Sequence, residues 1–251
     1  MPNLTALKTP SGFNDVELRK SSTTSDMSTL RDVQNATAIN STATFANVSH
    51  GTAFSSKYIY RTCLAFDLSG NDDDGSSISG NTVTSANLVI RSMANLSGFS
   101  SVLANTSNNI YVCKSNDPGS SWDISSFGNI DGRPSSGSYD GQVTVYGTAN
   151  EAANSSISFT LNSTCISDIN SKIGSGGKLL IILLCEDDFL FITSTGGLGS
   201  PTGGSGFFAR FEGVRIRTTE YATDTTHQPR LELTYGAAAA TDNATFFGAN
   251  F

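Results

Sequence analysis

The chain of 251 residues is acidic, with a formal net charge of −7 and a pI near 4.7, and its fifteen lysines and arginines are scattered along it. Acidic surfaces repel phosphate backbones, so this composition argues against nucleic-acid binding as the main role. Hydrophobic residues make up 37% of the chain and charged residues only 15%. Ser, Thr, Asn and Gly fill the difference, and these residues favour turns and strand surfaces over helices.

The amino-terminal sequence MPNLT lacks the charged segment and apolar run of a signal peptide. The longest apolar run, Leu179 to Cys185, is far shorter than the roughly twenty residues that a membrane helix needs. We therefore expect a protein that is made in a cytoplasm, carries no signal peptide and does not bind a membrane.

The four cysteines, Cys63, Cys113, Cys165 and Cys185, lie far apart in the sequence. Structural zinc sites use closely spaced pairs of ligands, which this chain does not have. Cytosolic synthesis favours free, buried thiols over disulfides. We expect no metal site and no cofactor.

The first half of the chain alternates between polar segments and clear strands. Residues 1–15 resemble an arm or a lead-in that lies along a sheet edge, and residues 21–56 are expected to form a loop with one or two edge strands. Between residues 57 and 68, Leu64, Phe66 and Leu68 fall on every second position, which predicts a strand with one buried face. The strands predicted in this half are Val16 to Lys20, Lys57 to Leu68, Val83 to Ser92 and Asn109 to Lys114.

The second half adds one helix to a further set of strands. Ser163 to Lys172 is the predicted helix, with Ser163 or Thr164 as its cap. Leu179 to Cys185 is apolar at every position, so we expect a central strand that is covered on both faces. Gly213 is expected to mark a bulge. The strands predicted here are Gln142 to Tyr146, Ile157 to Leu161, Leu179 to Cys185, Phe189 to Thr193, Phe207 to Thr218 and Pro229 to Tyr235.

About ten strands, one short helix and frequent turns predict an all-β, jelly-roll-like antiparallel β-sandwich in which the first and last strands pair. Residues 16–235 would form this single domain, between an arm at 1–15 and an aromatic tail at 236–251. The tail ends with Phe246, Phe247 and Phe251, which need a surface to dock on. Two alternatives stay open: the tail folds back onto its own sandwich, or it inserts into a neighbouring subunit.

The sequence offers few groups for catalysis. His50 and His227 lie in polar segments without a Gly-x-Ser-x-Gly motif, and no hydrolase triad is expected. The acidic loop at 71–74 lacks the glycine and glutamate of an EF-hand. Glu186 to Asp188 is interpreted as a charged turn that prevents edge pairing. We expect no catalytic residue and no enzyme activity.

Aromatic residues offer one alternative, a carbohydrate-binding surface. Trp122, Tyr111 and Tyr139 would stack on sugar rings, with Trp122 in a long loop at 115–141 where binding residues are common. The competing interpretation is that Trp122 packs within the loop or the core.

Three segments carry a family resemblance. They read Arg-Thr-Cys-Leu-Ala-Phe-Asp-Leu-Ser at 61–69, Val-Thr-Ser-Ala-Asn-Leu-Val-Ile at 83–90 and Pro-Arg-Leu-Glu-Leu-Thr-Tyr at 229–235. Together they resemble the DNRLRE-type jelly-roll domains, which are similar to a family of carbohydrate-binding modules. The matching segments are strand cores and a corner aspartate, so they imply the fold more strongly than a ligand site.

Domains of this kind occur in secreted sugar-binding proteins and in bacteriophage virions. A lone domain without a signal peptide, with an arm and an aromatic tail, is more typical of a virion protein. The resemblance therefore implies a non-enzymatic capsid cement or decoration protein, or a fibre or tail component. It would be located in the virion and would contact other virion proteins, such as a major capsid protein, and further copies of itself. The alternative is a carbohydrate-binding module that recognises surface glycans through Trp122 and Tyr139.

Overall fold

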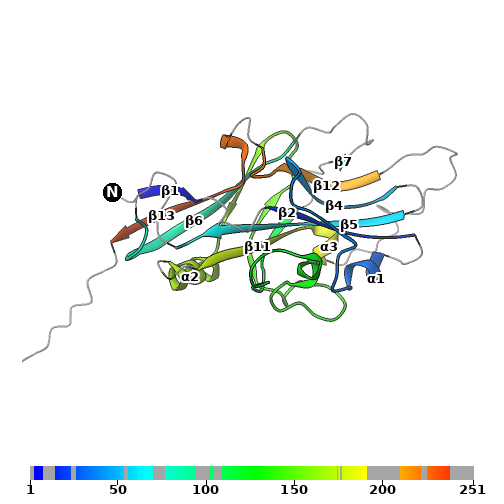
Figure 1. The fold of residues 1–251 in the computed structure, drawn as a ribbon, viewed down its shortest axis with the longest axis horizontal. Coiled ribbons are helices and arrows are strands. Elements are labelled where there is room, and N and C mark those ends of the chain that lie inside the picture. The colour runs from blue at the N-terminus through cyan, green and yellow to red at the C-terminus, as the bar shows by residue number, and fades with distance from the viewer. Residues whose placement is uncertain are drawn as a thin grey trace, which may run out of the picture.

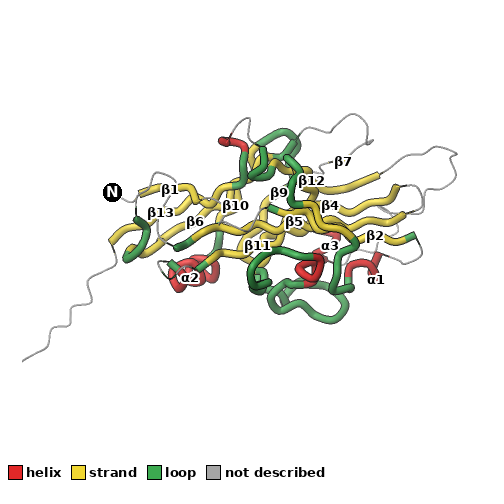
Figure 2. The backbone as a smooth tube through the Cα atoms, viewed as in Figure 1, coloured by secondary structure: helices red, strands yellow, loops and turns green. Residues whose placement is uncertain are grey.

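The protein folds as two β-sheets that pack face to face, as seen in a computed structural model (Figure 1, Figure 2). The expectation of an all-β sandwich is confirmed. The structure describes residues 3–7, 15–23, 27–53, 56–69, 77–93, 102–103, 109–173, 175, 177–190, 210–221 and 225–237.

The smaller sheet has four antiparallel strands, and it includes the first and last strands of the described chain. Asn3 lies opposite Tyr235 and Leu7 lies opposite Leu231, so part of the predicted arm is a strand on the sheet edge. The strand order is β1 (Asn3–Leu7), β13 (Arg230–Ala237), β6 (Asn81–Arg91) and β10 (Ser156–Thr160).

The larger sheet has nine strands and contains the strand with the clearest alternation, β5. Its main order is β7 (Val102–Leu103), β12 (Arg210–Arg217), β4 (Phe45–Ala53), β5 (Ser56–Asp67), β11 (Lys178–Cys185), β8 (Asn109–Lys114) and β9 (Val145–Asn150). The strand β2 (Val16–Ser22) also pairs with β5, and β3 (Ala38–Asn40) pairs with β2.

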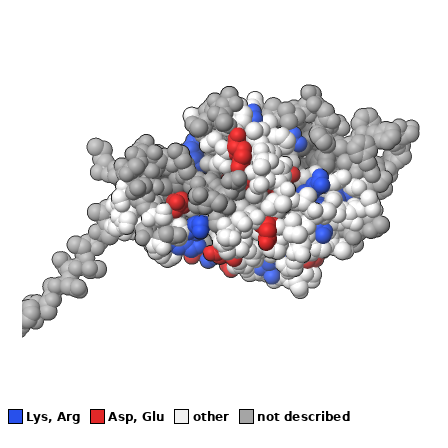
Figure 3. All heavy atoms as spheres, viewed as in Figure 1, with Lys and Arg blue, Asp and Glu red and all other residues white. Residues whose placement is uncertain are grey.

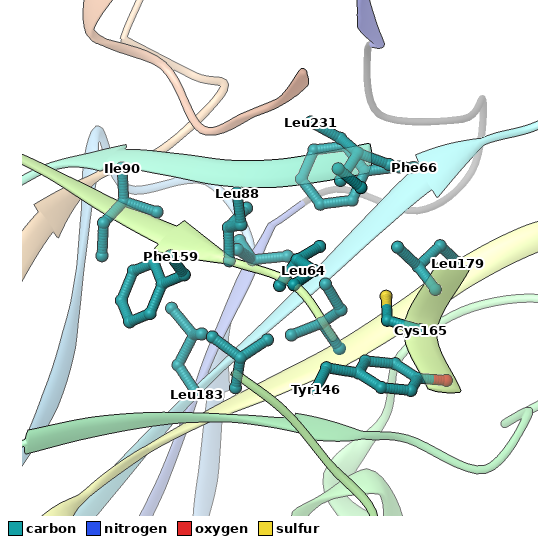
Figure 4. Close-up of a cluster of buried hydrophobic side chains, with 14 of the residues drawn as sticks. Leu64, Phe66, Leu88, Ile90, Tyr146, Phe159, Cys165, Leu179, Leu183 and Leu231 are labelled. Atoms are coloured by element: carbon teal, nitrogen blue, oxygen red, sulfur yellow. The ribbon is translucent and has the colours of Figure 1, made fainter. Parts of the chain in front are cut away.

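The main core lies between the two sheets (Figure 4). Leu64 and Phe66 of β5 meet Leu88 of β6, Phe159 of β10 and Leu231 of β13, and each of these side chains is at most 1% exposed. The alternation predicted for β5 and β6 therefore places their apolar residues on the faces that the two sheets share. Burial of apolar surface on this scale is the main stabilising contribution.

A second core covers the opposite face of the larger sheet. It lies under α1 (Met27–Arg31), the segment 115–144 and the 3₁₀ helix η1 (Ile124–Gly128). In β11, Ile181 and Leu183 face the first core, whereas Leu180, Ile182 and Leu184 face the second. The prediction that this strand is covered on both faces is confirmed, and the fold has three layers.

The predicted helix at 163–172 is confirmed as α2 (Ser163–Lys172), with one change at its start. The cap is Asn162, whose side-chain oxygen accepts a hydrogen bond of 3.1 Å from the Cys165 amide. Cys165 and Ile169 bury the inner face of α2 in the main core. The remaining short helices are α3 (Glu186–Leu190) and η2 (Thr225–His227). Among the described helices, none has the length and apolar content that crossing a bilayer requires.

Three predicted strand features differ from the structure. The strand expected at 189–193 is wrong for its first residues, which belong to α3. The reason is that Phe189 packs into the second core, where its ring stacks on that of Tyr111 with centroids 3.7 Å apart. The strand expected at 142–146 starts later, at Val145, because a turn closed on Tyr139 precedes it. The last predicted strand, at 229–235, pairs with β1 and β6, whereas the first predicted strand, at 16–20, pairs with β3 and β5 in the other sheet.

Two expectations for β4 and β12 also change. Residues 21–56 contribute β4, which lies inside the larger sheet between β12 and β5 and is not an edge strand. Gly213 does not interrupt the register of β12 with β4. Its φ is +128°, and an added Cβ would lie 2.2 Å from the carbonyl oxygen of Val48. The glycine therefore permits a close approach of two backbones.

Candidate functional site

The acidic helix α3 begins near the point along β5 where the neighbouring strand on one edge changes from β4 to β11. Residues 57–60 of β5 pair with both β2 and β4, whereas residues 62–63 pair with both β2 and β11. Since a strand has two edges, β4 and β11 must follow each other along the same edge. The strand β11 ends at Cys185, and α3 starts at this exchange point.

The three carboxylates at the start of α3 reach three different strands. Glu186 accepts hydrogen bonds from the backbone and side-chain nitrogens of Asn109 on β8, at 3.1 and 3.2 Å. Asp187 lies 2.9 Å from Nε2 of His50 on β4. Asp188 pairs with β5. The predicted charged turn is therefore wrong: these residues form the first turn of a helix and connect neighbouring strands.

The most buried ionic contact joins Arg61 of β5 to Asp188. The Nε and Nη2 atoms of Arg61 donate to the two carboxylate oxygens at 2.7 and 2.8 Å, and both side chains have no exposed surface. Arg61 also donates to the Phe127 carbonyl at 2.6 Å and to the Tyr139 hydroxyl at 3.1 Å. Burial alone would lower the pKa of Arg61, but Asp188 and Tyr139 together, through their charges and hydrogen bonds, outweigh it and raise the pKa above its ordinary value. The guanidinium therefore stays charged in the interior.

Arg31 of α1 completes this group from the second core. Its Nε donates to the Asp188 carbonyl at 2.5 Å, and its guanidinium carbon lies 3.8 Å from the centroid of the Tyr139 ring. We call Arg31, Arg61, Tyr139 and Asp188 the α3 cluster. It connects the central strand β5 to α1, α3 and the segment 115–144, so it holds the third layer on the sheet.

Trp122 and Tyr139, the residues that the carbohydrate-binding alternative would use, both lie in the second core, as the packing interpretation of Trp122 requires. Trp122 is 6% exposed and Tyr139 is fully buried, so neither ring presents a face to a ligand in this structure. The physical reason is that the segment 115–144 does not project as a loop. It lies flat on the larger sheet, and its aromatic residues face inward.

Beside the α3 cluster, a thiol, an imidazole and a carboxylate lie next to one another in space. The Sγ atom of Cys185 is 3.6 Å from Nδ1 of His50, and Nε2 of His50 contacts Asp187. This order of groups is found in cysteine nucleophiles. Cys185 is 2% exposed, however, and burial raises the pKa of its thiol well above the ordinary value. In this conformation the thiol keeps its proton and packs against His50.

The other candidate residues lie apart from this region or outside the described residues. His227 lies beside Tyr221, with ring centroids 6.5 Å apart. Within the described ranges, no group of three or more His, Cys, Asp or Glu residues could hold a metal ion. All four cysteines are buried and none forms a disulfide. The acidic loop at 71–74 and the tail residues Phe246, Phe247 and Phe251 lie outside the described residues.

Comparison with models of known protein families found no match, and no curated protein matched the chain. The resemblance to DNRLRE-type domains therefore stays a prediction. Two of its residues have structural roles here. Arg61 is the centre of the α3 cluster, and Asp67 accepts a hydrogen bond of 2.8 Å from the Ser69 amide where β5 ends.

Proposed function

We propose that this chain is a non-enzymatic structural protein of a virion, either a capsid cement or decoration protein or a fibre or tail component. It would act through contacts with neighbouring subunits. The observation that carries the proposal is the use of the buried charges. Arg61 and Asp188 bind each other and the surrounding layers, with no exposed surface, so these groups stabilise a scaffold.

The rigidity of the third layer also supports this proposal. The segment 115–144 and α1 cover one face of the larger sheet, and the α3 cluster fastens them to β5. Buried, bidentate Arg–carboxylate pairs fix geometry. A scaffold of this kind can present surfaces to other subunits without changing shape.

The surface and the end of β13 suggest how contacts would form. The charges on the face in Figure 3 are dispersed among uncharged residues, without a field of one sign. The strand β13 ends at Ala237, beside β1 in the smaller sheet. The sequence from 238 to 251 continues from that point and carries Phe246, Phe247 and Phe251. In the proposal these residues dock on a second copy of the chain or on a major capsid protein.

Removal of residues 238–251 tests the proposal. The cut follows Ala237, so β13 keeps its pairing with β6. The thermal unfolding midpoint should stay unchanged, whereas co-sedimentation with particles, or self-association measured by analytical ultracentrifugation, should be lost. A variant with serine in place of Phe246, Phe247 and Phe251 keeps the length of the tail and should show the same loss. Unchanged association in both variants would contradict the docking role of the tail.

A further inference from the structure

Two arginines face each other where the end of β6 meets β12 of the larger sheet. Ser92, directly after β6, forms an antiparallel bridge with Ile216 of β12, and this register places Arg91 opposite Arg217. Ser92 and Ile216 are buried, whereas Arg91 and Arg217 are half-buried, so both arginines lie on the side away from the core. The Cβ atoms of directly opposite residues are about 5 Å apart. We call Arg91 and Arg217 the arginine pair.

The described residues supply no counterion for the arginine pair. Charges of the same sign that lie directly opposite each other destabilise a strand pair. Within the part of the chain that the structure describes, no carboxylate forms an ion pair with either arginine. Arg230 of β13, on the same sheet as Arg91, differs because its Nε donates to Glu232 at 2.7 Å. The arginine pair therefore holds two positive charges that an external anion would neutralise.

The contact between Arg217 and Tyr221 leaves the hydrogen-bond donors of the arginine available. The guanidinium carbon of Arg217 lies 3.8 Å from the centroid of the Tyr221 ring, which is a close stacking distance. A stacked guanidinium uses its flat face, whereas its N–H groups lie along its edge. Neither Arg217 nor Arg91 donates a side-chain hydrogen bond to another described residue. Tyr221 therefore holds Arg217 in place without using the donors that an oxyanion needs.

Both members of the arginine pair line one cleft. Its volume is about 210 Å³, which is much more than one water molecule needs, and its walls include Tyr221, His227 and Asn154. Asn154 is exposed and has a φ of +50°, a left-handed conformation that asparagine tolerates. Its backbone amide donates to the Met93 carbonyl at 3.4 Å, which connects the segment before β10 to the segment after β6. The cleft therefore combines two cations with a neutral amide and two rings.

We propose that this cleft binds a phosphate group, either as inorganic phosphate or as the terminal group of a phosphate monoester. Near pH 7 a terminal phosphate carries a charge of about −1.5 to −2, which matches the arginine pair better than a single carboxylate does. Its oxygens accept paired hydrogen bonds from the edge of a guanidinium. The side-chain amide of Asn154 would add a donor at the rim. The net charge of −7 disfavours a long polyanion, but one dianion needs only the local charge of the cleft.

The test uses the full chain and does not depend on the proposed structural role. The probes are inorganic phosphate and glycerol 3-phosphate, with chloride at the same ionic strength as the reference. Titration calorimetry should show one site per chain, and phosphate should raise the thermal unfolding midpoint because it binds the folded state. Arg91→Gln and Arg217→Gln should each weaken binding about tenfold or more, since each removes charge-assisted hydrogen bonds. Arg19→Gln removes the same charge from β2, outside this cleft, and is the matched control.

The outcomes separate the alternatives. Binding that is weakened in Arg91→Gln and Arg217→Gln, and kept in Arg19→Gln and after removal of residues 238–251, supports the phosphate site. The tighter of the two probes then identifies the source as free phosphate or a monoester. Folded protein that binds neither probe overturns the proposal, and so does an equal loss in Arg19→Gln, which would show non-specific attraction. Tighter binding of acetate or citrate than of phosphate assigns the cleft to carboxylates and also overturns the proposal.

Discussion

The α3 cluster and a second group of polar and aromatic residues lie on opposite sides of β5. This second group, which we call the tyrosine face, consists of Glu17, Arg19, Asn47, Tyr58, Tyr60 and Arg215. Tyr60 and Arg61 are consecutive on β5, so their side chains point to opposite faces. On one side an arginine, a carboxylate and an aromatic ring are fully buried under the third layer. On the other side the same types remain half-buried. The third layer makes the difference: the groups under it are fully buried and hold the layers together, whereas most of the tyrosine face stays half-buried.

The sharpest way to test this comparison is to remove the charge of Asp188. Asp188→Asn leaves Arg61 charged and buried opposite a neutral amide, which should lower the free energy of unfolding by about 3–5 kcal/mol. Urea denaturation followed by tryptophan fluorescence would measure the loss, because Trp122 lies in the second core. Asp187→Asn, one residue earlier on α3, is the control and should cost clearly less. Equal losses would mean that the start of the helix, and not the buried pair, carries the stability.

Substitution of Gly213 tests whether the close approach of β12 and β4 contributes to stability. Gly213→Ala places a Cβ at a φ of +128° and 2.2 Å from the Val48 carbonyl oxygen, so β12 and β4 must separate locally. The expected cost is about 1–3 kcal/mol. Gly236→Ala on β13 is a matched control, since an added Cβ there meets no atom within 4 Å. A thermal midpoint that falls equally in both variants, or in neither, would contradict the close approach of the two strands.

The smallest predicted effect concerns Glu17, the only acid of the tyrosine face. Burial raises the pKa of Glu17 above its ordinary value, and the hydrogen bonds from Asn47 and the charge of Arg215 oppose this only in part. The folded protein therefore holds this proton more tightly than the unfolded chain. The contribution of Glu17 to stability is fully present below the ordinary glutamate pKa and is lost as pH rises through the raised one.

Glu17→Gln should therefore raise the thermal midpoint at pH 7, by up to about 3 °C. The difference from the unmodified protein should shrink as the pH approaches 4. Scanning calorimetry at several pH values would measure it, with Glu232→Gln as a control on the smaller sheet. A lower midpoint at pH 7 would show that the ionised carboxylate stabilises the face.

Strands with regular alternation were predictable because burial on one face imposes a period of two. The strand β6 follows that pattern, and the all-apolar run of β11 correctly indicated cover on both faces. The prediction of a single buried face is wrong for β5, because the third layer also buries Cys63 and Ala65 on its second face. The helix α3 was not predictable in this way. It is five residues long, and its acidic start is equally compatible with a turn. Its stability comes from contacts with β4, β5 and β8, and a local pattern carries no information about such partners.

The same limit applies to the candidate sites. Arg61 stands out as a charge within an apolar strand, but its partner Asp188 lies 127 residues later. Trp122 had two interpretations, sugar stacking in a long loop or packing within the loop or the core, and the sequence of its segment did not decide between them. In the structure that segment packs on the sheet, and its backbone bonds to the sheet and to the connection before β3, as the Ser115 amide does to the Leu180 carbonyl and the Ile124 carbonyl does to the Ala36 amide. The position of Tyr58 and Tyr60 on one face of β5 could have been predicted from the sequence, since they alternate with the buried Ile59.

The exchange of neighbours along β5 has a consequence for synthesis on the ribosome. Asp67 of β5 lies opposite Lys178 of β11 in the sheet. Arg61 can bind the carboxylate of Asp188 only after α3 has been translated. A nascent chain that stops before β11 therefore carries a central strand with half of one edge open and an arginine without its counterion. Contacts this distant in sequence make folding slow, because the intervening chain must be ordered first. We expect the domain to fold late and as one unit, after most of its length has left the exit tunnel.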